Sequence, residues 1–247
     1  RLFRLPDDEA IINRMGFNNE GHWEALKRLK AQKRIGIVGV NIGANKESTD
    51  RISDYVAGIA AFSEVADYIT INISSPNTPG LRGLQSADEL ERLLSRLNDA
   101  RSTQSKQPAM LLKIAPDLGD EEMHDVAACC ANGAVDGVII SNTTLSRPAL
   151  SSVHGSEAGG LSGRPLFDLS TRQLAKFYIL SGGKIPLMGV GGIENGETAL
   201  TKIEAGASLL QVYSALVYQG PALVHDILRT LTNAVHISGS LAALCGR

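Results

Sequence analysis

Cysteine is scarce in this chain, and no long apolar run occurs in it. The 247 residues include three cysteines, and the adjacent pair Cys129 and Cys130 lies in a helical pattern far from Cys245. This distribution argues against a disulfide framework and indicates reduced thiols in a cytosolic setting. No apolar stretch approaches the ~20 residues that a membrane-spanning helix needs, and the first residues do not have the pattern of a signal peptide.

Neither sign of charge is in large excess. Lys and Arg total 24 against 26 Asp and Glu, which gives a net charge of -2, and no basic stripe is interleaved with aromatic residues. Nucleic acid is therefore not expected as a partner. The five histidines lack the spacing of metal ligands, so no metal site is expected.

Short β-branched runs recur along the chain, and each is followed by a segment of helical length and amphipathic pattern. The expected strands are 35–40, 68–73, 110–114, 137–141, 186–190 and 208–213. Most are continuously apolar, as strands covered on both faces are. Repeated strand-helix units predict a mostly parallel sheet in a single domain spanning 1–247.

The position of the glycine loops decides between an open doubly wound sheet and a closed barrel. No G-x-G-x-x-G pattern follows the first strand, where a dinucleotide-binding fold has it. Glycines such as Gly191 and Gly192 instead follow the fifth and sixth strands. Barrels often bind phosphate after strands seven and eight. The sequence therefore predicts the last six units of a TIM (β/α)8 barrel, with two further strands upstream.

Polar side chains stand at the ends of four of these strands. Asn41 and Asn72 stand at the ends of the first two, Lys113 lies in the third, and Ser141 ends the fourth and is followed by Asn142. An asparagine alone is readily explained as a turn residue. A lysine inside an apolar strand is costly unless it meets an anion or a cofactor. Together these residues predict a polar ring at one mouth of the barrel.

Five motifs, in their order and spacing, resemble those of dihydroorotate dehydrogenases. They occupy 72–78, 113–117, 141–144, 159–163 and 189–193, and the segment 13–19 extends the likeness. The resemblance runs from Arg1 to about Leu228. Ser75 precedes Pro76 where the fumarate- or NAD-linked branch of the family carries cysteine. This difference indicates the quinone-linked branch, also called class 2.

The resemblance implies FMN-dependent oxidation of (S)-dihydroorotate to orotate in the biosynthesis of UMP. It makes Ser75 the base that removes a proton from C5, while hydride passes from C6 to FMN and the electrons pass to a quinone. Serine is a weak base at its ordinary pKa and needs a proton path. By resemblance, Thr78 and Phe17 line that path.

The resemblance also assigns the binding residues. Those implied for substrate are Asn13, Arg14, Met15, Gly16, Phe17, Asn72, Asn77, Asn142 and Thr143. Those implied for FMN are Asn41, Asn72, Lys113, Ser141, Gly163, Gly191, Gly192, Tyr213 and Ser214. Lys113 is expected near N1 and O2 of the flavin, where a cation stabilises the anionic reduced form. The phosphate is expected on backbone N–H groups near the glycines and a helix start.

The glycine-rich segment 79–85 follows Ser75 closely. Its composition and position suggest a mobile lid that keeps water from the reacting carbon. A plain strand-to-helix loop is the alternative.

The chain departs from the family pattern at both ends. The first two strands, with the lysine that meets the substrate carboxylate, are missing from it, as are the membrane-associated helices that form the quinone tunnel. The tail 229–247 is also atypical. The expected location is peripheral to the cytoplasmic side of a bacterial inner membrane, or the mitochondrial inner membrane in a eukaryote. A fumarate- or NAD-linked enzyme, a related FMN barrel, and a non-catalytic remnant remain as alternatives.

Overall fold

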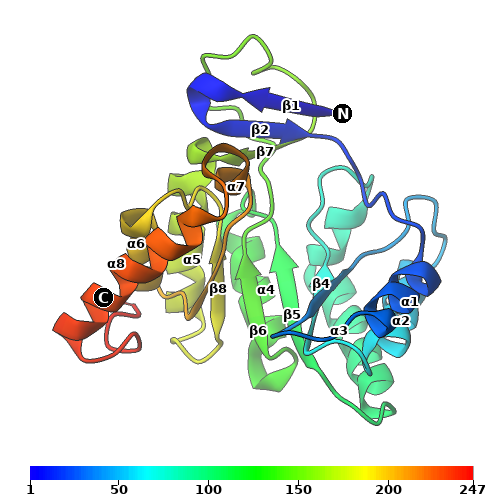
Figure 1. Cartoon of the computed structure of the whole chain (residues 1–247). Helices are drawn as coiled ribbons and strands as arrows, with labels where there is room; N and C mark the ends of the chain where they lie inside the picture. The colour runs from blue at the N-terminus through cyan, green and yellow to red at the C-terminus, as the bar shows by residue number, and fades with distance from the viewer. Residues whose placement is uncertain (247) are drawn as a thin grey trace.

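The computed structural model describes residues 1–246, and its centre is a curled six-stranded parallel sheet (Figure 1). The strands are β3 (Gly39–Ile42), β4 (Tyr68–Asn72), β5 (Ala109–Ile114), β6 (Gly137–Ile140), β8 (Leu187–Val190) and β9 (Leu209–Gln211). They lie side by side in chain order, and every adjacent pair is parallel. This order is that of a barrel wall. The prediction of six consecutive strand-helix units of a TIM barrel is confirmed.

Helices flank the sheet on its outer side. They are α1 (His22–Ala31), α2 (Arg51–Phe62), α3 (Ala87–Ser102), α4 (Asp120–Cys130), α5 (Phe167–Leu180), α6 (Gly196–Glu204), α7 (Ser214–Gln219) and α8 (Ala222–Ser238). In the chain α2 to α6 lie between strands of the sheet, α1 precedes β3, and α7 and α8 follow β9. In Figure 1, α1 to α3 lie at the right of the view, near the β3 end of the curled sheet, and α5, α6 and α8 lie at the left, near its β9 end. The atypical tail continues α8 as far as Ser238.

The core lies between the sheet and these helices. On α3 the residues Leu90, Leu93, Leu94 and Leu97 share one face and are buried, as the spacing of an amphipathic helix requires. Tyr55 of α2 is fully buried, and its hydroxyl donates to the Asn72 carbonyl at 2.8 Å. This bond fastens α2 to the end of β4.

A small antiparallel sheet, which the sequence patterns did not predict, lies across one end of the large sheet (Figure 1). Its strands are β1 (Leu2–Leu5), β2 (Ala10–Asn13) and β7 (Gly160–Gly163). β2 pairs with β7 from Ala10 opposite Gly163 to Asn13 opposite Gly160. Each strand has only four residues, too few for a clear alternation.

The first strand of the large sheet starts later than expected. β3 begins at Gly39, and the predicted strand residues Ile35 and Ile37 are 86% and 82% exposed. β3 is an edge strand with β4 as its single neighbour. The Asp67 amide donates to the Val38 carbonyl at 2.8 Å, and no backbone pairing of residues 35–37 extends the ladder within the described chain. The apolar pattern therefore predicted residues 35–37 as part of the strand, although β4 does not pair with them.

One lysine is buried within this fold, away from the strand ends. Lys202 of α6 is fully buried, and its Nζ donates to Ser170 Oγ of α5 at 2.6 Å. The ammonium also lies 5.2 Å from the centre of the Phe167 ring. Burial lowers the pKa of Lys202 to about 7, and the nearby Asp168 carboxylate opposes this shift.

This lysine is expected to make stability depend on pH. Because its pKa in the folded state lies below that in the unfolded state, the unfolded chain binds more protons between about pH 7 and pH 10. The free energy of unfolding should therefore rise with pH in that window, with a limiting slope of about 1.4 kcal/mol per pH unit from this group. Urea unfolding of wild type and Lys202→Met at pH 7 to 9 measures the slope, which should be smaller in the variant by the contribution of Lys202.

The matched control is Lys184→Met, which removes an exposed lysine in the loop before β8. Parallel pH profiles for wild type and Lys202→Met would contradict the prediction.

Candidate active site

A cavity of about 540 Å³ lies between the carboxyl ends of the parallel strands and the small antiparallel sheet. It is lined from both sheets and from the start of α7. The lining includes twelve of the residues singled out from the sequence: Asn13, Met15, Gly16, Lys113, Ser141, Asn142, Thr143, Gly163, Gly191, Gly192, Tyr213 and Ser214. Residues far apart in the chain thus meet at one mouth of the sheet.

The amides at the strand ends form a connected network. Asn142 Nδ2 donates to Asn72 Oδ1 at 3.1 Å and to Ser74 Oγ at 3.0 Å. Asn72 Nδ2 donates in turn to Asn41 Oδ1 at 3.3 Å. Asn41 and Asn72 do not line the cavity themselves, but these bonds hold them directly behind Asn142.

Asn77 ties the loop after β4 to the small sheet. Its Nδ2 donates to the carbonyl and side-chain oxygens of Asn13, at 3.1 and 3.2 Å. Its backbone N–H donates to Ser75 Oγ at 3.3 Å. The position of Ser75 is therefore coupled to that of the small sheet.

Ser75 and Thr78 are buried, at 8% and 4% exposure, and do not line the cavity. Among the described residues, no carboxylate or imidazole is hydrogen-bonded to Ser75 Oγ. Phe17 packs against Gly43, where a Cβ would lie 2.7 Å from the Phe17 ring. The structure thus places Phe17 beside the end of β3, not in the cavity lining.

Lys113 projects into the cavity from β5. Along this strand Met110, Leu112 and Ile114 are buried, whereas Leu111 and Lys113 are half-buried, because alternate side chains of a strand face opposite ways. Burial lowers the pKa of Lys113 to about 8. Within residues 1–246 the ammonium has no ion-pair or hydrogen-bond partner. It is a partly desolvated cation that faces open space, and so it favours an anion there.

Glycines shape the opposite end of the cavity. Gly163, Gly191 and Gly192 have φ values of +96°, +107° and +72°, a region that other residues rarely adopt. A Cβ on Gly192 would lie 2.5 Å from Phe167 at the start of α5. These positions therefore require glycine and leave backbone groups at the cavity wall. The arrangement suits an anionic group near a helix start.

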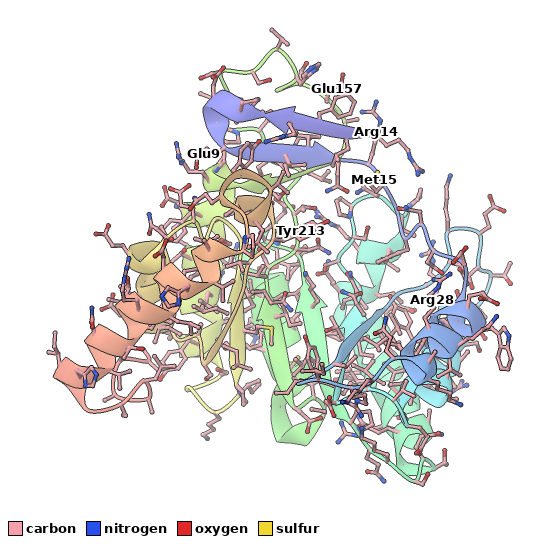
Figure 2. The ribbon with its side chains drawn as sticks, viewed as in Figure 1. Glu9, Arg14, Met15, Arg28, Glu157 and Tyr213 are labelled. Atoms are coloured by element: carbon pink, nitrogen blue, oxygen red, sulfur yellow. The ribbon has the colours of Figure 1, made fainter. Side chains whose placement is uncertain are left out.

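An ion-pair cluster at the rim was missed from the sequence. Arg164 is 2.6 Å from Glu9 and 2.9 Å from Glu194, and all three residues line the cavity. The cluster joins the β1–β2 hairpin, whose Glu9 Figure 2 labels, to the loop after β8. Arg164 directly follows the glycine motif 159–163, and this position could have marked it as a cavity residue. Glu9 gave none, because the hairpin itself was not predicted.

Comparison with known proteins identifies the family. The family model described as dihydroorotate dehydrogenase matches residues 1–235. The chain belongs to the dihydroorotate dehydrogenase family. A Brucella anthropi relative named dihydroorotate dehydrogenase (quinone) is 55% identical over 255 residues, covering 100% of this chain and 70% of the relative. A Mesorhizobium japonicum relative of the same name is 57% identical over 225 residues, covering 90% of this chain and 63% of the relative.

A solved structure supports the fold of this dihydroorotate dehydrogenase family member. The crystal structure of Eimeria tenella DHODH in complex with ferulenol superposes with a TM-score of 0.94 at 36% identity. The match covers 100% of this chain and 73% of the Eimeria chain.

Arg14, which the resemblance assigns to substrate binding, does not line the cavity in this structure. Figure 2 shows it beside Glu157 at the small sheet, and the two side chains form an ion pair of 2.8 Å. The guanidinium also lies 4.6 Å from the centre of the Phe3 ring. Its neighbours Asn13 and Met15 line the cavity. In extended backbone alternate residues face opposite ways, so Arg14 points outward.

The segment 79–85 is folded and packed against the core in this structure, and its interpretation as a mobile lid stays a prediction. The segment contains the 3-10 helix η2 (Leu81–Gln85), in which Leu81, Leu84 and Gln85 are buried. Gln85 Oε1 also accepts from the Ala115 amide at 2.9 Å, just after β5. Buried apolar contacts and an internal hydrogen bond are features of a fixed segment. The alternative, a plain connection between strand and helix, fits better.

The sequence predicts neither a membrane-spanning helix nor a cluster of metal ligands. No helix within residues 1–246 combines the length and apolarity needed to cross a membrane. Over the same residues, no three His, Cys, Asp or Glu side chains gather as metal ligands.

The environment of Lys113 leads to a prediction about its titration. In the ligand-free protein, its ammonium should titrate near pH 8, and an anion that fills the cavity should raise this pKa because it favours the charged form. NMR titration of ¹³C-dimethylated lysines measures the midpoint. Lys113→Arg identifies the resonance by removing it, and Lys202→Met identifies any second lowered midpoint. A Lys113 midpoint in the range of the exposed lysines would contradict the prediction.

Proposed function

We propose that this chain supplies the FMN- and substrate-binding barrel domain of a quinone-linked dihydroorotate dehydrogenase, which oxidises (S)-dihydroorotate to orotate in UMP biosynthesis. Family membership supports the reaction class. The observation that carries the residue-level proposal is that unpaired Lys113 shares one cavity with Asn142 and with the Gly191–Gly192 loop. The cavity therefore offers a cation, amides that can bind a ring, and a site for an anion.

The cavity fits FMN in size and in the chemistry of its walls. Its volume of about 540 Å³ lies within the roughly 300–1,000 Å³ of small-molecule sites. Lys113 offers a cation to N1 and O2 of the flavin ring, and Gly163, Gly192, Tyr213 and Ser214 offer backbone N–H groups to the phosphate. Asn41, Asn72 and Ser141 would hold the ring edge. When bound, FMN supplies the acceptor for the hydride that leaves C6 of the substrate.

The substrate ring would be held by amide and hydroxyl groups. Asn13, Asn142 and Thr143 present such groups at the cavity, and Asn77 and Asn72 are hydrogen-bonded to two of them from outside the lining. Met15, Gly16 and the rim near Phe17 would close the site. An amide buried without its partner costs about 1–3 kcal/mol. The site should therefore reject ring analogues that lack the matching groups.

In the proposed reaction Ser75 accepts the proton from C5, and the hydride leaves C6. The substrate loses two electrons and these two hydrogens, and a C5=C6 double bond forms. Ser75 is buried, so water has little access to its Oγ. Thr78 and Phe17 would line the path by which the proton leaves Ser75, since no carboxylate or imidazole among the described residues is bonded to its Oγ.

The quinone acceptor is supported by the presence of Ser75 and by the names of the bacterial relatives. A peripheral location at the cytoplasmic side of the bacterial inner membrane is part of the same proposal, because quinones reside in membranes.

The role of Ser75 can be tested by replacing it. Ser75→Ala should retain bound FMN but reduce it about 10²–10⁴-fold more slowly with dihydroorotate, the usual contribution of a positioned base. Anaerobic stopped-flow absorbance of the flavin measures this rate across pH. Ser75→Cys is the matched control, since a thiol can also act as the base. Full activity of Ser75→Ala at every pH would show that the base is another group.

A further inference from the structure

Arg82 and Asp117 lie in motifs singled out from the sequence, yet neither has a role in the function proposed above. Arg82 belongs to η2, which begins six residues after Ser75. Asp117 follows the end of β5 by three residues. The two side chains form an ion pair of 2.9 Å with exposures of 23% and 20%. A pair this well covered is screened less by solvent than a surface pair.

All three guanidinium nitrogens of Arg82 are used, and each bond goes to a different strand-end loop. Nε donates to the Ser74 carbonyl after β4 at 3.1 Å. One terminal nitrogen donates to Asp117 after β5 at 2.9 Å, and the other donates to the Thr143 carbonyl after β6 at 3.1 Å. The planar fork of arginine can hold three fixed acceptors in this way, whereas the ammonium of lysine cannot.

Asp117 completes the connection from the other side. Its Oδ1 accepts from the hydroxyls of Thr144 and Ser146, and its Oδ2 accepts from the Leu145 amide at 3.2 Å. The carboxylate thus binds Arg82 and three consecutive residues that follow Thr143. Charge-assisted hydrogen bonds of this kind are stronger than neutral ones.

The bonded groups lie next to the groups proposed to react. The Ser74 carbonyl directly precedes the base Ser75, and Thr143 is itself a cavity residue beside Asn142. The base loop cannot move away from the substrate amides unless the Arg82 bonds break. Since a misplacement of about 1 Å can cost about 10²-fold in rate, the connection is suited to catalysis.

We propose that Arg82 and Asp117 form a clamp that sets the position of the Ser75 loop relative to Asn142 and Thr143. They act as positioning residues for proton removal from C5 of the substrate. The role in proton removal rests on the proposed function. The hydrogen bonds that form the clamp do not depend on it.

The first test concerns the clamp and needs no substrate. Hydrogen exchange followed by mass spectrometry compares wild type with Arg82→Lys and Asp117→Asn. Peptides covering 74–77 and 143–146 should exchange at least ~10-fold faster in both variants, because local opening no longer breaks charge-assisted bonds. Arg92→Lys is the matched control, since Arg92 pairs with Glu89 on the exposed face of α3 and its replacement should leave both peptides unchanged. Unchanged exchange in Asp117→Asn would overturn the clamp.

The second test concerns catalysis and uses the FMN-loaded protein with dihydroorotate deuterated at C5 or at C6. Flavin reduction should slow ~10–100-fold in Arg82→Lys and Asp117→Asn, from the misplacement cost given above. The isotope effect at C5 should grow relative to that at C6, because the variants displace the base Ser75 and so slow proton removal more than hydride transfer. A general loss of folding would not change this ratio. Added guanidinium should partly restore the rate of Arg82→Ala.

The outcomes separate the two proposals. Faster exchange with a wild-type reduction rate and unchanged isotope effects would overturn the positioning role. If wild-type protein with bound FMN is not reduced by dihydroorotate, the proposed function fails, and the exchange experiment still decides whether the clamp exists.

Discussion

The hydrogen-bonded register of the parallel sheet determines where every polar group of the cavity lies. In a parallel sheet all carboxyl ends meet at one edge, and the pairing of one strand with the next sets how far each end reaches. Here Asn72 lies opposite Lys113, and Ile114 lies opposite Ile140, directly before Ser141. A slip of one residue would exchange the faces of the strand and turn Lys113 toward the helices. The site therefore depends on backbone pairing before it depends on any side-chain contact.

Two lysines that lose solvent on folding, fully buried Lys202 and half-buried Lys113, have different partners. Burial lowers the pKa of Lys113 and of Lys202. Lys202 has a hydroxyl partner and an aromatic ring within the protein, and it connects α6 to α5. Lys113 has no such partner among the described residues and faces the cavity. A lowered lysine pKa alone therefore does not indicate a binding site. Lys113 differs from Lys202 in that its ammonium points into a cavity.

The parts of the fold predicted from sequence are those with local patterns. Apolar runs predicted the six parallel strands, and polar residues at their ends predicted the gathering of Lys113, Asn142 and Gly192. The small sheet could not be predicted this way, because β2 finds its partner β7 about 150 residues later. The orientation of Arg14 depended on that sheet. The glycines of the 79–85 segment suggested mobility, but its sequence pattern did not indicate that its two leucines pack in the core.

The pairing of β2 with β7 also bears on how the protein folds. Ala10 and Gly163 are neighbours in the small sheet, so this contact closes a very long loop, and such closures carry an entropy cost that slows their formation. The parallel strands from β3 to β6 can assemble from shorter connections while the ribosome is still adding residues. The small sheet that covers the cavity cannot form completely until β7 has left the ribosome. The cavity is complete later still, because β8, β9 and the start of α7, which supply part of its lining, follow β7 in the chain.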